Sequence, residues 1–373
     1  MTYHHRRPSY WEIDRYYRRA DYTVLGAGIV GTTAALRLRE RFPKARIVLL
    51  ERGNLPAGAS TRNAGFACFG SPGELLDDLE TIGAEATAAL VKLRLRGLER
   101  LRNLVGDGAL QYADAPAYEL LSEADFARIA PRLPELNALL QPICGQTATY
   151  RTIDSPLPEF SRAVQIFGEG QLHPAAMMEA LHERARRADI QTLRGIELTH
   201  WSEREDGLTL WNDAQRLFLT RHLLICTNGF AKKLLPELDV QTVRNQVLIT
   251  KPLSGKIPEG NFHLERGYVY FRNVGNRILL GGGRHLDFAG ETTDEFGGTE
   301  AIENYLIQLL HERILPGRNA KIAARWSGIL GVGPSREPIV RRVSDRIGVA
   351  VRLGGMGVAI GALVGKRAGE LFR

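Results

Sequence analysis

The sequence predicts an α/β protein in which one domain is assembled from separated segments of the chain. Near the N-terminus, a short apolar run leads into a glycine-rich turn, a helical pattern and a second apolar run. The chain also closes on an apolar run, a glycine-rich turn and a helical pattern. Alternating apolar and polar residues between these two units predict an antiparallel sheet. The expected architecture is a Rossmann-like domain joined to an α+β domain built on that antiparallel sheet.

The composition is that of a globular protein. Apolar residues make up 44% of the 373 residues and charged residues 24%, which excludes a disordered or fibrous chain. No apolar run is long enough to span a bilayer, and the N-terminal segment lacks the apolar region of a secretory signal. The cysteines, Cys68, Cys144 and Cys226, have no metal-binding spacing. We therefore expect free thiols, no metal site and a cytoplasmic protein.

The net charge of +7 does not by itself indicate nucleic-acid binding. In the arginine-rich segment 90–105, Val91, Leu98 and Leu101 belong to an apolar helical stripe, which leaves the arginines on a solvated face. We therefore expect a small molecule, and not a nucleic acid, as the partner. The sequence sets no oligomeric state.

The first unit has the order strand, turn, helix and strand. Tyr22–Leu25 predicts a buried strand, the helical pattern begins at Ile29, and residues 45–51 predict a second buried strand. This order predicts a dinucleotide-binding βαβ unit. The turn has GxGxxG spacing, with Gly26, Gly28 and Gly31.

Each residue of this motif has a physical role. Gly26 permits the tight turn, Gly28 lets the backbone approach a pyrophosphate, and Gly31 lets helix and strand pack closely. The N-terminus of the helix then stabilises the phosphate charge. Glu51 ends the second strand, where a carboxylate can accept hydrogen bonds from ribose hydroxyls and would repel a 2′-phosphate. The unit alone leaves NAD and FAD open.

Three later segments favour FAD. Residues 58–70 (GASTRNAGFACFG) place small and polar residues beside the expected phosphate or flavin. Residues 221–231 run from an apolar strand into the turn Thr227-Asn228-Gly229. Residues 346–372 repeat the order strand, glycine turn and helix. A chain that opens and closes in this way can bind both ends of one long cofactor, whereas NAD(P) dehydrogenases rarely return to the cofactor with their last helix.

With these segments in this order, the sequence resembles the D-amino-acid oxidase, glycine oxidase and sarcosine oxidase superfamily of FAD-dependent oxidoreductases. The matching residues are VLGAGIVG (24–31), Glu51, GASTRNAGFA (58–67), GQLHPAAMMEAL (170–181), CTNGF (226–230), RWSG (325–328) and GGMGVAIG (354–361). The resemblance implies an FAD-binding domain at residues 1–75, 161–240 and 325–373. It also implies a substrate-binding domain at residues 76–160 and 241–324. FAD is expected to be non-covalent, because no cysteine lies where sarcosine oxidases attach it.

The motifs and the resemblance together predict the residues that bind FAD. They are Gly26, Gly28, Ile29, Val30, Gly31, Glu51, Arg52, Ala59, Ser60, Thr61, Arg62, Asn63, Gly65, Ile196, Thr227, Asn228, Gly229, Gly354, Gly355, Met356, Gly357 and Val358.

The segments between the two glycine units predict helices first and strands later. Residues 76–160 predict mainly helices interrupted by prolines, and residues 173–189 predict an amphipathic helix with Pro174 in its first turn. Alternation from 245 to 287 predicts antiparallel strands, and a further helix is expected at about 299–314.

The substrate side is predicted on the segment GYVYFRN (267–273). Alternation places Tyr268, Tyr270 and Arg272 on one strand face, where they could bind a carboxylate above a flavin. The resemblance implies substrate contact for Tyr268. Arg284, next to His285, is a second candidate, and Trp326 completes the expected catalytic residues. The alternative is an ordinary amphipathic strand whose polar side faces solvent.

Two positions depart from the family pattern. Leu330 stands where amino-acid oxidases of this family have the arginine that binds the substrate carboxylate, and Ala359 stands where sarcosine oxidases have a lysine. A substrate carboxylate must therefore bind another cation, unless the substrate has none there.

The expected reaction oxidises a C–N bond of an amino acid or amine by hydride transfer to flavin N5, followed by hydrolysis of the imine. This step needs no general base from the protein if the amine is bound neutral. Oxygen or a quinone would reoxidise the flavin. Three alternatives stay open: an FAD enzyme that acts on a modified tRNA base, a 2-hydroxy-acid oxidoreductase, and a flavoprotein without catalytic activity.

Overall fold

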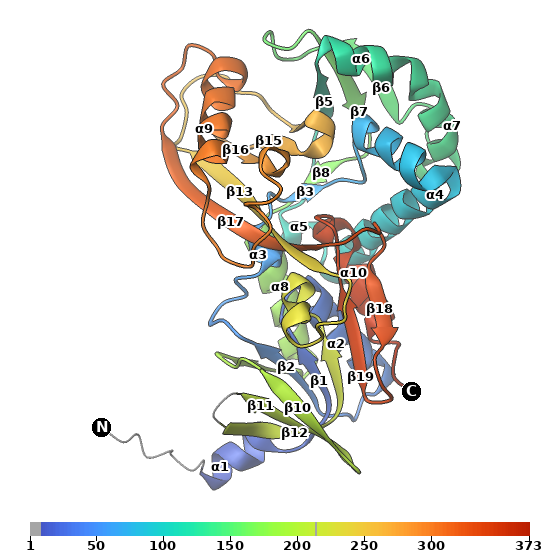
Figure 1. Cartoon of the computed structure of the whole chain (residues 1–373), viewed down its shortest axis with the longest axis vertical. Helices are drawn as coiled ribbons and strands as arrows, with labels where there is room; N and C mark the ends of the chain where they lie inside the picture. The colour runs from blue at the N-terminus through green and yellow to red at the C-terminus, as the bar shows by residue number, and fades with distance from the viewer. Residues whose placement is uncertain (1–8, 213–214) are drawn as a thin grey trace.

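The computed structural model describes residues 9–212 and 215–373. Two large sheets form the two lobes of the molecule (Figure 1). In Figure 1 the first sheet lies in the lower lobe and the second in the upper lobe, with both cores covered by helices. Within the described residues, no helix has the length and apolar character needed to cross a bilayer.

The first sheet is mainly parallel. Its central strands are in the order β9, β2, β1, β12 and β19, and all four pairings between them are parallel. The N-terminal half of β12 pairs with the antiparallel β10–β11 hairpin, and β18 pairs with β19. The bounds are β1 Ala20–Leu25, β2 Ile47–Glu51, β9 Gln191–Arg194, β10 His200–Arg204, β11 Gly207–Asn212, β12 Gln215–Ile225, β18 Ile339–Arg342 and β19 Ile347–Val351.

Three helices cover one face of this sheet. They are α2 (Ile29–Arg41), α8 (Pro174–Arg187) and α10 (Gly357–Ala368), and their apolar residues share one core with those of β1 and β2. The opening and closing helices, α2 and α10, pack directly against each other. The two ends of the chain therefore build one domain, because the opening and closing units bury their apolar faces together.

The second sheet has the order β17, β13, β16, β15, β14, β5, β7 and β6. Only the β14–β5 pairing is parallel. The bounds are β5 Ala117–Leu121, β6 Tyr150–Asp154, β7 Arg162–Ile166, β13 Gln241–Thr250, β14 Asn261–Leu264, β15 Val269–Val274, β16 Arg277–Gly282 and β17 Ile322–Val332. This sheet shares a core with α9 (Glu300–Leu309) and with η6 (Leu310–Ile314), which follows α9 directly.

The remaining elements connect these layers. The long helix α4 (Pro72–Val105) contacts both α10 and α7 (Leu133–Cys144), and it breaks at Gly83, whose φ is 80°. The other elements are α1 Tyr10–Glu12, η1 Ile13–Tyr17, α3 Ala59–Arg62, β3 Phe66–Ala67, α5 Asp107–Leu110, β4 Ala113–Asp114, α6 Glu123–Ile129, η2 Ala130–Arg132, β8 Gly170–Gln171, η3 Asn228–Lys233, η4 Glu265–Gly267 and η5 Arg284–Leu286.

The predicted fold class is confirmed, and the structure corrects its details. The expected strands and helices of the first and last units form β1, α2, β2, β19 and α10. Residues 76–160 contain the short strand β4 and two longer strands, β5 and β6, that the sequence analysis missed. Their short runs have no hairpin signal, and β5 is selected by pairing with β14, which lies about 140 residues away in the chain. In addition, β7 and residues 325–332 of β17 belong to the second sheet, although these residues fall inside the segments expected for the FAD-binding domain.

Candidate active site

Two adjoining cavities lie along the boundary between the sheets. The first has a volume of about 1480 Å³ and the second about 1440 Å³, including the open space at their mouths. The first borders the carboxyl ends of β1, β2 and β12, and the second borders β13, β14 and β15. Both cavities share a wall made by Ala59, Asn63, Leu330, Gly355 and Val358. The two cavities are therefore neighbouring compartments of one cleft.

The first cavity contains the glycine turn between β1 and α2. Gly26 has a φ of +98°, and a side chain there would also collide with the carbonyl oxygen of Cys226. A Cβ atom at Gly31 would lie 1.9 Å from the Gly26 carbonyl oxygen. The turn and the close packing thus both require glycine. Helix α2 begins at this cavity with no side-chain cap from Gly28, and the Ile29 N–H donates to Ser60 Oγ at 3.0 Å.

Glu51 lies at the end of β2 in the same cavity. Its Oε2 accepts a hydrogen bond from the Ala27 N–H at 3.1 Å, and its Oε1 accepts one from the Gly53 N–H at 3.0 Å. Because each carboxylate oxygen has two acceptor positions, both oxygens retain capacity for a ligand hydroxyl.

The closing turn is held against the first cavity by Asn228. Its side chain lies between η3 and the end of β19, and its Oδ1 accepts from the N–H groups of Arg352 at 3.2 Å and Leu353 at 3.4 Å. The neighbouring Thr227 Oγ1 is buried and has no hydrogen-bond partner among the described residues. A buried hydroxyl without a partner is costly, which indicates a ligand at this wall.

Most of the predicted FAD-binding residues line these cavities. Arg62, Gly65, Gly354 and Met356 line the second cavity only, and Gly31, Thr61 and Gly229 line neither. Gly229 packs instead against the carbonyl oxygen of Leu330, and Thr61 Oγ1 donates to the Pro56 carbonyl oxygen. The predicted residues that line the first cavity are Gly26, Gly28, Ile29, Val30, Glu51, Arg52, Ala59, Ser60, Asn63, Ile196, Thr227, Asn228, Gly355, Gly357 and Val358.

The first cavity has the chemistry that FAD requires. Glycines and the N-terminus of α2 suit a pyrophosphate, and the Glu51 carboxylate suits ribose hydroxyls. Arg52 and Lys233 place positive charge at its wall. The apolar residues there, among them Ile196 and Leu198, suit a flat ring. The residues present therefore fit the cofactor that the sequence predicts.

The second cavity contains two of the three residues predicted on the GYVYFRN segment. Tyr268 and Tyr270 line it together with Arg284. Tyr268 does not belong to β15: it follows a turn in which Glu265, Arg266 and Gly267 all have positive φ values. Burial raises the pKa of the Tyr270 phenol to about 12, so this hydroxyl stays protonated.

Among the described arginines that line this cavity, Arg284 is the one whose guanidinium has neither a hydrogen-bond nor an ion-pair partner. Its Cζ lies 5.9 Å from the ring centroid of Tyr268 and 5.0 Å from that of Phe288, and no hydrogen bond or ion pair joins its guanidinium to another described residue. By contrast, Arg62 Nη1 donates to the Ser327 carbonyl oxygen at 3.0 Å. Arg336 Nε lies 2.9 Å from Asp78 Oδ1, and Arg266 Nη1 lies 3.7 Å from Asp77 Oδ2. Burial lowers the pKa of Arg284, because the guanidinium loses water. An anion in the cavity would restore that lost solvation.

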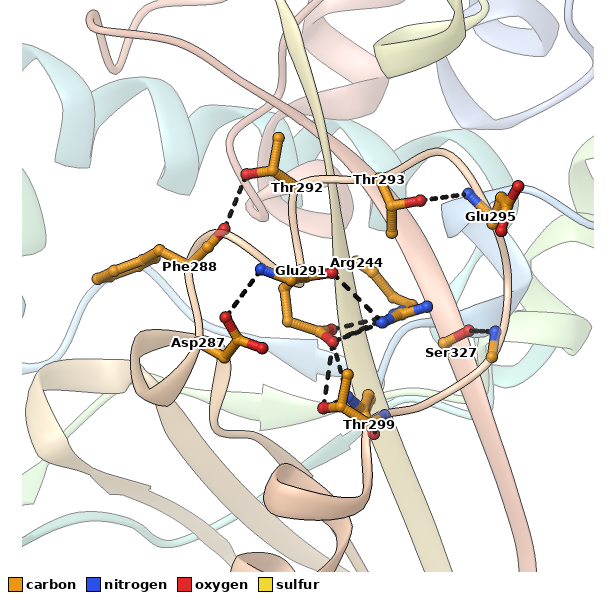
Figure 2. A network of polar contacts seen from close by, with 12 residues as sticks. Arg244, Asp287, Phe288, Glu291, Thr292, Thr293, Glu295, Thr299 and Ser327 are labelled. Atoms are coloured by element: carbon orange, nitrogen blue, oxygen red, sulfur yellow. Dashed lines mark hydrogen bonds and ion pairs between the residues drawn. The ribbon is translucent and has the colours of Figure 1, made fainter.

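The segment after Arg284 is fixed by a buried polar network (Figure 2). Glu291 Oε1 accepts hydrogen bonds from Arg244 Nη2 at 2.7 Å and from Gln246 Nε2 at 2.9 Å. Further along the segment, the Gly297 N–H donates to Ser327 Oγ at 3.0 Å. These bonds hold the loop that carries Phe288, and with it the ring against which Arg284 packs.

Arg272 and Trp326 are not where the sequence predicts them. Arg272 is buried outside both cavities, with its Nη1 on Gln171 Oε1 at 2.9 Å and its Nη2 on the Leu172 carbonyl oxygen at 3.1 Å. Strand alternation places Arg272 on the same face as Tyr270, but this end of the face is covered by the segments that hold Ala64 and Leu172. The structure therefore does not place Arg272 at the cavity where the sequence predicts that it binds substrate. Trp326 also lies outside both cavities, and its Nε1 donates to the Arg62 carbonyl oxygen at 3.0 Å, which positions α3. His285 pairs with Glu265 at 2.9 Å and does not line either cavity.

Sequence reasoning missed His263 and Asn245, which both line the second cavity. Asn245 Oδ1 is buried without a hydrogen-bond partner among the described residues. His263 lies on β14 directly opposite Tyr270 of β15. The alternation of FHLERGYVYF suggests two paired strands, but no local pattern shows which histidine faces a cavity.

Comparisons with known proteins identify the family of this chain. Residues 21–371 match the DAO family, described as FAD dependent oxidoreductase. The L-2-hydroxyglutarate dehydrogenase of Escherichia coli strain K12 is 26% identical over 311 residues, which cover 77% of this chain and 71% of that protein. The structure is similar to L-proline dehydrogenase from P. horikoshii, with a TM-score of 0.74, 16% identity and coverage of 95% and 93% of the two chains. It is also similar to iminodiacetate oxidase from Chelativorans sp. BNC1, with a TM-score of 0.73, 19% identity and coverage of 92% and 93%. The chain therefore belongs to the DAO family of FAD-dependent oxidoreductases.

Proposed function

We propose that this enzyme oxidises a small amine that carries a negative charge, such as an amino acid. FAD would lie in the first cavity with its flavin at the shared wall, and the substrate would lie in the second cavity. The observation that carries this proposal is Arg284, a half-buried cation with no anionic partner among the described residues. When bound, the flavin supplies the acceptor for the hydride from the substrate carbon. The chain's own residues bind and orient the substrate: Arg284 holds its anion, and Tyr268 and Tyr270 flank its body.

A 2-hydroxy acid is the second candidate substrate. It has the same carboxylate for Arg284, with a hydroxyl in place of the amine. The Escherichia coli relative, named as an L-2-hydroxyglutarate dehydrogenase, supports this reading. Oxidation removes an N–H proton from an amine and an O–H proton from a hydroxy acid. A direct comparison of the two classes as substrates therefore distinguishes the two candidate functions.

An anaerobic screen of the purified protein tests the proposed function. We expect a yellow protein that releases intact FAD on heat or acid denaturation, because no covalent attachment is proposed. Amino acids, uncharged amines and 2-hydroxy acids are then added without oxygen, and loss of flavin absorbance is measured. Fast bleaching by an amino acid supports the proposal, and fast bleaching only by a hydroxy acid replaces it with the second candidate. A flavin that no compound of these classes reduces would contradict both.

Replacing Glu51 with alanine is expected to weaken FAD binding at least tenfold. Its carboxylate would accept hydrogen bonds from the ribose, and one charge-assisted bond contributes about 1.5–3 kcal/mol. The measurement is the dissociation constant of FAD for the apoprotein. Glu197→Ala is the matched control, because Glu197 lines the same cavity but pairs with Arg52 at 3.6 Å on an exposed surface. Equal dissociation constants for the two variants would show that Glu51 does not reach the ribose.

A further inference from the structure

His263 forms part of the wall of the second cavity and is paired with a buried carboxylate. Its Nε2 lies 3.0 Å from Glu169 Oε2, and the Glu169 side chain is fully buried. The other ring nitrogen, Nδ1, has no hydrogen bond to any described residue. A neutral His263 that donates its Nε2 proton to Glu169 thus has an acceptor lone pair at Nδ1.

Other groups of this wall are either held protonated by burial or paired with an arginine. Burial raises the pKa of Tyr270 to about 12 and raises that of the Cys68 thiol well above its ordinary value. Glu74 is paired with Arg94 at 2.9 Å, and Asp77 is paired with Arg128 at 3.0 Å. The arginines carry no lone pair for a proton. His263 differs from these groups, because its Nδ1 has a lone pair and no hydrogen-bond partner among the described residues.

The charges around His263 come from three other elements. Glu169 precedes β8, Glu119 lies opposite His263 on β5, and Glu74 lies on α4. Burial by itself would lower the pKa of His263, but Glu169, by attraction and by its hydrogen bond, then Glu119 and Glu74, raise it above its ordinary value. Burial also raises the pKa of Glu119 to about 7. Tyr270, Phe66 and Asn261 complete the surroundings without a further charge.

We propose that His263 Nδ1 accepts the proton that the substrate's amine or hydroxyl must lose before or during oxidation. This inference rests on the proposed function and adds a residue to it. The N–H or O–H bond of the substrate breaks, its electron pair stays on the substrate heteroatom, and an N–H bond forms on the imidazole. Glu169 then balances the positive charge of the imidazolium within the wall. His263 thus keeps the substrate in the form that can release a hydride.

The pH dependence of flavin reduction in the holoenzyme tests this role. The rate constant is measured without oxygen at saturating concentration of the best substrate. For the unchanged protein, we expect the rate to rise with pH through the pKa of His263 and then to level off, because only neutral His263 accepts a proton. His263→Gln can still donate a hydrogen bond to Glu169 but cannot take up a proton. Its rate should fall about 10²- to 10³-fold on the plateau and should lose this inflection.

A second variant and a control distinguish proton transfer from a merely structural effect. Glu169→Gln should move the inflection to lower pH, because the carboxylate raises the pKa of His263. His285→Gln is the control: it makes the same substitution in a His–Glu pair of similar length, 2.9 Å, outside the cavity. It should keep the inflection at the pH of the unchanged protein.

The outcomes separate this inference from the proposed function. An active protein in which His263→Gln keeps the original inflection overturns the role of His263 alone. If His263→Gln does not retain FAD, Glu169→Gln decides, and an unmoved inflection overturns the role. A protein whose flavin no amine, amino acid or hydroxy acid reduces overturns the proposed function itself, before any variant is compared.

Discussion

Arg284→Met is expected to raise the Michaelis constant for an anionic substrate by about 10- to 150-fold. Methionine keeps the length of the side chain and removes its charge. The loss of one charged hydrogen bond costs about 1.5–3 kcal/mol, which corresponds to that range. Arg284 packs against Tyr268 and Phe288 without an ion pair to a described residue, so its removal leaves no buried carboxylate uncompensated. The melting temperature and the FAD content should therefore stay close to those of the unchanged protein.

Arg325→Met is the matched control for this prediction. Arg325 is half-exposed, pairs with Glu303 at 3.4 Å and lies outside both cavities. The Michaelis constant of this variant should stay within about twofold of the unchanged value, since surface ion pairs contribute little. The contrary result is that Arg284→Met behaves like Arg325→Met and that uncharged amines are the best substrates. The substrate then has no anion at this wall, which agrees with Leu330 at the position of the family's carboxylate-binding arginine.

Arg272→Met is expected to destabilise the fold. Any change in substrate binding should follow from that loss of stability. The Arg272 guanidinium donates to the carbonyl oxygens of Ala64 and Leu172 and to Gln171. Methionine would leave two buried carbonyl groups without donors, at about 1–3 kcal/mol each. The free energy of unfolding should therefore fall by about 2–6 kcal/mol, measured by urea denaturation of the holoprotein. Burial lowers the pKa of Arg272 to about 10, so the charge itself is retained at neutral pH.

The opposite result would restore the interpretation drawn from the strand pattern. If Arg272→Met melts at the temperature of the unchanged protein and raises the Michaelis constant more than Arg284→Met does, then Arg272 reaches the substrate. The paired measurement of stability and Michaelis constant thus assigns each arginine to one role.

The lining of the first cavity was largely predictable because its signals are local. The glycines between β1 and α2, the acid at the end of β2 and the closing turn before α10 each depend on residues close in sequence. A tight turn needs a positive φ, and a close helix–strand contact needs a missing side chain. Both requirements are visible in the residue types themselves.

The substrate side could not be predicted in the same way. Strand alternation predicts that Tyr268, Tyr270 and Arg272 share one face. Segments from distant parts of the chain cover the end of that face where Arg272 lies. The residues that cover Arg272 lie about 100 and 208 positions away in the sequence. Likewise, the role that we propose for His263 depends on Glu169, which lies 94 positions earlier.

The sequence by itself thus determined the fold class, the family and the cofactor, since these depend on periodicity and on short motifs in a given order. Tertiary structure alone decided which arginine is free to bind an anion and which histidine has a buried carboxylate beside a cavity. The physical reason is that the charge of a buried side chain can act on a ligand only where no other part of the chain already satisfies it. Arg272 is satisfied by backbone carbonyl groups from distant segments, whereas Arg284 has two aromatic rings as its neighbours.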